Sequence, residues 1–168
     1  MIQQNNLTKL QLTVLVVLRY LIGWHLFYEG IAKLMNPSWS SLGFLQQSGG
    51  VLAGFSRWVI SHPDVLKVVD ELNIWGLIAI GLGLLLGLFA REAALAGAVL
   101  VFVYYLNCPP LVGVEYTIPV DGNYLIVNKT LVEAVALCVL ALFPTSNQFG
   151  LDAFLTRKKK VKEKGDVQ

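Results

Sequence analysis

The apolar stretch 10–34 is long enough to cross a bilayer, yet it contains four ionisable side chains. An uncompensated charge at the centre of a bilayer costs about 3 kcal/mol, so these groups need partners inside a protein. At ~100° per residue they occupy one third of the circumference of a helix, and an aromatic set at 20, 24, 27 and 28 occupies the opposite side. The four ionisable residues are Arg19, His25, Glu29 and Lys33.

The composition excludes an ordinary soluble domain. The 168 residues are 55% hydrophobic and 14% charged, and the mean hydropathy is +0.62. We therefore expect an all-α membrane protein, with one domain over 1–156 and a basic tail over 157–168. Four stretches have the length and apolarity of membrane spans, which predicts a four-transmembrane-helix bundle: 10–34, 72–90, 93–108 and 124–143.

The basic residues predict the orientation of these spans. The lysine-rich tail and Lys9 place both termini on the cytoplasmic side by the positive-inside rule. The long connections 36–71 and 109–123 then face the other side, which is self-consistent for an even number of spans. The net charge of +2 gives no reason to expect a nucleic-acid partner. A cleaved signal sequence is a poor alternative for the first stretch, which is too long and ends in charged residues.

The two long connections contain elements of their own. In the first, Ser38 or Ser40 is placed to cap a short helix, and residues 52–60 form a second amphipathic piece. Pro63 is typical of an early helical position, so the next helix is expected to begin near Asp64 and run into the second span. In the second connection, 112–118 favours an extended lid.

The charges of the first and fourth stretches have matching spacing. Glu29 and Lys33 are four residues apart, as are Lys129 and Glu133. Glu133 is expected to reach Arg19, Lys33 or Lys129, forming a charge-balanced polar site between the two spans that opens outward. The two cysteines show no CxxC and no His/Cys cluster, so we expect no metal site.

Two interpretations of this cluster stay open. The pairs can simply hold the helices together and set their register. Alternatively, intramembrane ionisable groups mark a ligand or proton path. A quinone head group suits the second interpretation, because Lys or Arg can polarise a carbonyl while Glu or His passes a proton. His25 beside Trp24 can equally be a packing residue.

Three segments resemble the DoxX/DoxD family of membrane proteins: RYLIGWHLFYEGIAKL at 19–34, GLGLLLGLFAR at 81–91 and FGLD at 149–152. The resemblance implies a four-helix, multi-pass protein of the inner (cytoplasmic) membrane. It also implies a relation to the membrane subunit of thiosulfate:quinone oxidoreductase, with Arg19, Glu29 and Lys33 at matching positions. A membrane quinone and a partner protein follow as expectations. Independently of the resemblance, the small residues Gly83, Gly87, Ala93 and Gly97 predict close helix packing within the chain or self-association. The chain departs from the family at Leu77, where members often have a glutamate after a glycine.

Two functions therefore compete. The first is a subunit of a quinone-linked membrane oxidoreductase, with the polar site between the first and fourth spans. The second is a non-catalytic scaffold that docks an extracytoplasmic partner protein through the long connections. A solute transporter is less well supported, because no span repeats another.

Overall fold

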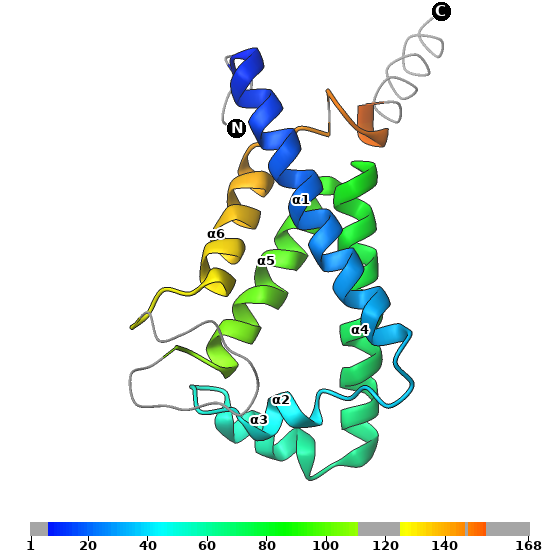
Figure 1. Cartoon of the computed structure of the whole chain (residues 1–168), viewed down its shortest axis with the longest axis vertical. Helices are drawn as coiled ribbons and strands as arrows, with labels where there is room; N and C mark the ends of the chain where they lie inside the picture. Colours follow the sequence, from blue (N-terminus) through cyan, green and yellow to red (C-terminus); the bar gives the residue numbers. More distant parts are fainter. Residues whose placement is uncertain (1–6, 111–124, 147, 154–168) are drawn as a thin grey trace, which may run out of the picture.

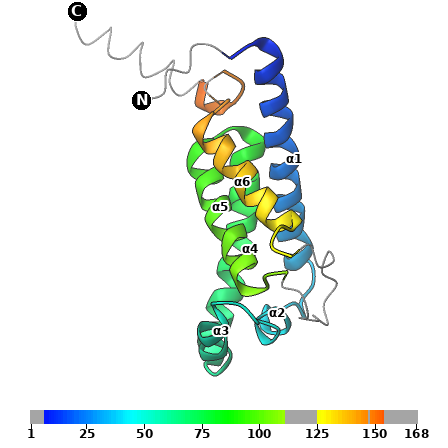
Figure 2. The same ribbon diagram turned by 90° about the vertical axis from the view of Figure 1, so that its left-hand side faces the viewer.

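The structure is a computed structural model that describes residues 7–110, 125–146 and 148–153. This part of the chain contains helices and no strand, as the composition predicted. Four helices lie side by side, and two short ones cross one end of them (Figures 1 and 2). The helices are α1 (Lys9–Leu34), α2 (Leu42–Gln46), α3 (Ala53–Ile60), α4 (Pro63–Leu86), α5 (Ala90–Asn107) and α6 (Lys129–Leu142).

Helices α1 and α4 have the length and apolarity needed to cross a membrane. Helix α1 packs along α4, α4 contacts α5, and α5 packs along α6. On α1 the predicted aromatic side faces outward, since Tyr20, Trp24 and Tyr28 are each about half exposed or more. An exposed surface of this kind is what a lipid-facing helix presents.

Glycines allow α1 and α4 to approach closely. A Cβ at Gly30 would lie 2.7 Å from Ile78 Cγ1, and a Cβ at Gly81 would lie 2.5 Å from the backbone nitrogen of Phe27. Because lipid provides no hydrophobic force between helices, such backbone approach supplies much of the packing energy. The close packing of α1 on α4 thus depends on Gly30 and Gly81.

The boundaries of α4 differ from the predicted span 72–90 at both ends. Pro63 occupies the first helical turn, as predicted, so the helix begins well before residue 72. The helix stops at Leu86 because Gly87 adopts a left-handed conformation, with φ at 63°. Residues 87–89 form the turn, and Ala90 already belongs to α5. An apolar run does not reveal this turn, since its residues are as hydrophobic as their neighbours.

Helix α6 begins at Lys129, later than the predicted start at 124. The side chain of Asn128 accepts a hydrogen bond from the Leu131 backbone N–H, at 2.9 Å, and so caps the helix. The predicted lid 112–118 and the tail 157–168 lie outside the described residues.

The connection between α1 and α4 is anchored to the bundle. Ser41 precedes α2 and bonds to Asp70 of α4 through its backbone N–H and its hydroxyl. Asn107, at the end of α5, accepts hydrogen bonds at 2.7 Å from the hydroxyls of Ser48 and Ser56. These contacts hold α2 and α3 across the end of the four helices, and α2 thereby closes one side of a cavity.

Candidate functional site

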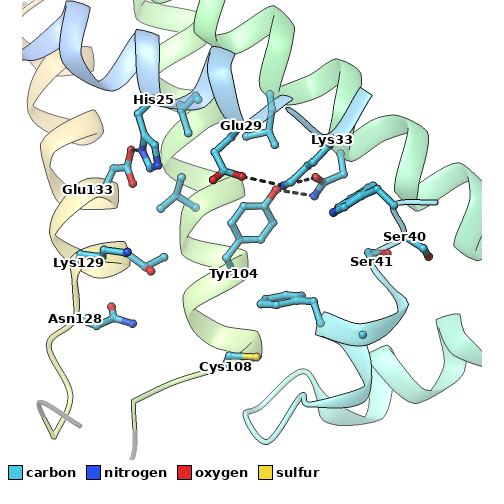
Figure 3. Close-up of a pocket in the computed structure, with 18 residues that line it drawn as sticks. His25, Glu29, Lys33, Ser40, Ser41, Tyr104, Cys108, Asn128, Lys129 and Glu133 are labelled. Carbon is cyan, nitrogen blue, oxygen red and sulfur yellow. Dashed lines mark hydrogen bonds and ion pairs between the residues drawn. The ribbon is translucent and has the colours of Figure 1, made fainter. Parts of the chain in front are cut away.

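A cavity of about 520 Å³ lies among α1, α4, α5, α6 and the segment leading into α2 (Figure 3). This volume is within the range of small-molecule sites. Its apolar wall includes Leu26, Leu77 and Val101, with the rings of Trp39 and Phe44 toward α2. Its polar lining comprises His25, Glu29, Lys33, Ser40, Ser41, Asn73, Tyr104, Asn128, Lys129, Thr130 and Glu133, together with the Cys108 thiol.

Lys33 has partners on several sides of its ammonium group. Its Nζ donates to Asn73 Oδ1 at 3.0 Å and lies 3.7 Å from Glu29 Oε2. It also sits over two rings, 5.0 Å from the centroid of Trp39 and 5.7 Å from that of Tyr104. Carboxylate, amide and aromatic faces together compensate the ammonium charge. The lysine is therefore fixed at the cavity wall, with only 17% of its side chain exposed.

Asn73 links this lysine to α5. Its Nδ2 donates to the hydroxyl oxygen of Tyr104, at 2.6 Å. The ring of Tyr104 is held in turn by the edge-to-face contact with Phe44 of α2, with centroids 5.8 Å apart. One hydrogen-bonded cluster at this side of the cavity thus combines side chains from three helices: Lys33, Asn73 and Tyr104.

A second polar group joins α1 to α6. His25 Nδ1 and Glu133 Oε1 lie 2.8 Å apart. The glutamate side chain is 16% exposed, whereas the histidine side chain is 52% exposed. Figure 3 shows the pair facing the Lys33 group across the cavity, with Lys129 and Asn128 beside it. The pair can exchange a proton between imidazole and carboxylate at the outer edge of the site.

Lys129 occupies an unusual place for a cation. It is the first residue of α6, where the helix dipole favours negative charge. Helix stability therefore does not explain it, but charge balance in the cavity does: Lys33 and Lys129 face Glu29 and Glu133. The formal charges of these two lysines and two glutamates sum to zero.

The structure brings together five of the six predicted site residues, namely His25, Glu29, Lys33, Lys129 and Glu133. The sixth, Arg19, does not line the cavity. Its guanidinium is buried, donating to Thr145 Oγ1 at 2.9 Å and to the carbonyl of Phe149 at 2.6 Å. Glu133 reaches His25 by a direct hydrogen bond, a pairing that the charge pattern alone did not select.

Sequence reasoning missed three side chains that shape the site: Trp39, Asn73 and Tyr104. Asn73 offered a signal, because an amide is unusual in an apolar helix and requires a partner. Tyr104 and Trp39 offered little, since aromatic residues are common near membrane interfaces. Leu77, which stands where the family often has glutamate, is buried and lines the cavity, so the chain has an apolar wall there.

Three comparisons with known proteins were informative to different degrees. The family model described as DoxX matches residues 14–107, a range that covers most of α1 and the whole of α2, α3, α4 and α5. Comparison with curated proteins and with solved structures gives no match.

Proposed function

The chain belongs to the DoxX family, and from that premise we propose that it binds a membrane quinone in the cavity, as a subunit of a quinone-linked oxidoreductase. The observation that carries this proposal is the cavity's combination of balanced charges with aromatic and aliphatic walls. Balanced charges favour an uncharged ligand, and the fixed polar groups favour one that carries oxygen atoms. A quinone ring has both properties.

The residues present fit such a ligand. Trp39 and Phe44 offer flat apolar surface, while Lys33 offers a cation to polarise a carbonyl oxygen. His25, hydrogen-bonded to Glu133, can hold a proton at the outer edge. A bound quinone would accept two electrons and two protons, the electrons coming from the reduced redox cofactor of a partner protein.

The proposal includes a four-span arrangement in the cytoplasmic membrane with both termini inside. Helices α5 and α6 lie alongside α1 and α4, and this shared direction supports their spanning the same layer (Figure 1). The end that carries α2 and α3 then faces outward, together with the nearer part of the cavity.

The test is extraction of bound quinone from purified full-length protein. Lys33→Ala removes the cation of the cavity, and Lys67→Ala removes an exposed lysine of α4 that does not line it. We expect organic solvent to extract quinone from the wild type and from K67A, and at least tenfold less from K33A while its helix content is retained. Equal quinone content in K33A and K67A would contradict the proposed site.

One observation favours the alternative of a docking subunit. Helix α3 exposes Phe55 and Trp58, stacked on each other with ring centroids 5.9 Å apart, at the end of the bundle. An exposed apolar surface of this kind suits a protein partner or the lipid interface. Absence of quinone from the wild type, together with a stoichiometric co-purifying protein, would favour docking.

A further inference from the structure

The hydrogen bonds that join Lys33, Asn73 and Tyr104 have only one possible direction. An ammonium group can donate but not accept, so the atom of Asn73 that lies 3.0 Å from Lys33 Nζ has to be the carbonyl oxygen. The amide nitrogen of Asn73 therefore faces Tyr104. Because this nitrogen can only donate, the hydroxyl oxygen of Tyr104 is the acceptor at 2.6 Å.

This direction leaves the hydroxyl proton of Tyr104 available. The bond from Asn73 uses a lone pair of the oxygen, so the O–H is not donated to Asn73. Lys33 has three N–H bonds, of which one is directed at Asn73. Both residues line the cavity. Because Asn73 holds both residues, the O–H of Tyr104 and an N–H of Lys33 are available to a ligand in the cavity.

Glu29 is the acidic group nearest this pair of donors. Its Oε2 lies 3.7 Å from Lys33 Nζ, which is an ion pair rather than a short hydrogen bond, and its side chain is 49% exposed. The carboxylate is therefore loosely held. A ligand oxygen can take the place beside the donors while Glu29 turns toward the opening.

We propose that Lys33 and Tyr104 form a two-donor subsite that selects a hydrogen-bond acceptor, with Asn73 as the positioning residue that sets the direction of the tyrosine O–H. The inference rests on the proposed function and specifies its ligand. A quinone carbonyl oxygen has two in-plane lone pairs, one for each donor, whereas a quinol hydroxyl has a proton in place of one of them and can accept well from only one donor. The site is therefore selective for the oxidised form.

The test measures binding of ubiquinone-1 and of ubiquinol-1 under anaerobic conditions to the full chain in detergent, by quenching of tryptophan fluorescence. Tyr104→Phe removes the donor and keeps the ring that packs against Phe44. Tyr105→Phe is the matched control, because the Tyr105 hydroxyl donates to the carbonyl of Ile126 and does not line the cavity. In Y104F we expect about tenfold weaker binding of the quinone and less than threefold change for the quinol, with Y105F like the wild type.

A second variant tests the role of Asn73. In Asn73→Asp the carboxylate accepts from both neighbours, so the Tyr104 O–H turns away from the cavity and the preference for quinone should fall as it does in Y104F. The double variant N73D/Y104F should then lose no further preference, because both changes remove the same donor. If Y104F prefers quinone over quinol as strongly as the wild type does, or if the losses of preference add up in the double variant, the proposed subsite is wrong. The proposed function would not be affected by either result. Failure of the wild type to bind either form would overturn the proposed function itself.

Discussion

At the scale of single residues, Arg19 has a structural partner far along the chain. It donates to the carbonyl of Phe149, and the next residue, Gly150, packs its Cα 2.7 Å from the place where Gly87 would carry a Cβ. Asp152 donates its backbone N–H to the carbonyl of Gly87. The arginine, the turn glycine and the FGLD segment, three features that carry the family resemblance, therefore meet in one cluster at the end of the bundle opposite α2.

Arg19→Ala should reduce stability more than it reduces ligand binding. The change leaves Thr145 and the Phe149 carbonyl without their buried donor, at a cost of about 2–3 kcal/mol. Arg19→Lys should recover only part of this loss, because an ammonium group lacks the planar fork with which the guanidinium reaches both acceptors. Thermal unfolding in detergent measures both effects. Loss of quinone from R19A protein that unfolds at the wild-type temperature would place Arg19 in the ligand site instead.

Asp152 caps a helix to which it is not adjacent in sequence. Its carboxylate oxygens accept from the backbone N–H groups of Phe89, at 2.9 Å, and Ala90, at 3.3 Å. Phe89 itself precedes α5 with φ at 47°, a costly conformation for a non-glycine residue, and its side chain cannot cap. The remote aspartate thus stabilises both the strained residue and the start of α5.

We expect Asp152→Ala to lower the free energy of unfolding by about 1–2 kcal/mol, as for other lost helix caps. Asp152→Asn keeps one acceptor oxygen and should lose less than the alanine variant. Chemical denaturation in mild detergent, followed by circular dichroism, gives the comparison. Equal stability of D152A and the wild type would show that the cap contributes nothing.

At the scale of helices, the register of α1 against α4 depends on two close contacts. Gly30 of α1 meets the backbone of Ile78, and Gly81 of α4 meets the backbone of Phe27, so each glycine faces main chain that cannot move aside. Residues His25, Glu29 and Lys33 lie on α1 around these contacts. The glycines therefore set where the charged side chains of α1 stand relative to Asn73.

Gly81→Ala should separate the two helices and lower stability by about 1–3 kcal/mol, because the new methyl group overlaps backbone atoms. Gly76→Ala is the matched control on the same helix, since nothing lies within 4 Å of its Cβ position. There the higher helix propensity of alanine should leave stability unchanged or raise it by about 0.5–1 kcal/mol. Thermal unfolding of both variants is the measurement, and equal losses would contradict the close contact.

At the scale of the whole molecule, the orientation in the membrane can be measured directly. In a chain with Cys108 and Cys138 replaced by alanine, single cysteines are introduced by Thr8→Cys, before α1, and Ser61→Cys, between α3 and α4. An impermeant maleimide should label Ser61→Cys on intact cells and Thr8→Cys only after permeabilisation. The start of α1 and the turn between α3 and α4 lie at opposite ends of the bundle (Figure 1), so labelling of both cysteines from outside would contradict the proposed topology.

The sequence alone determined the class of the molecule and most of the charged residues that line its cavity. Apolarity and length are properties of a contiguous segment, so α1 and α4 were recognisable as helices able to cross a membrane, and helical periodicity placed the three ionisable residues that line the cavity on one side of α1. The equal spacing of charges on the fourth stretch indicated that Lys129 and Glu133 share the same cavity, although it did not select the pairing of Glu133 with His25. Pro63 marked the start of α4 by its local conformational restriction.

Only the tertiary structure decided which distant groups pair. Arg19 belongs to the cluster at the opposite end of the bundle because its depth along α1 matches that of Thr145 and Phe149, not because its charge differs from that of Lys33. Asn73 and Tyr104 enter the site because the packing of α4 on α1 and α5 brings an amide between an ammonium group and a hydroxyl. A local pattern specifies the face of a helix, whereas the depth and rotation of one helix against another arise from contacts between residues far apart in the chain.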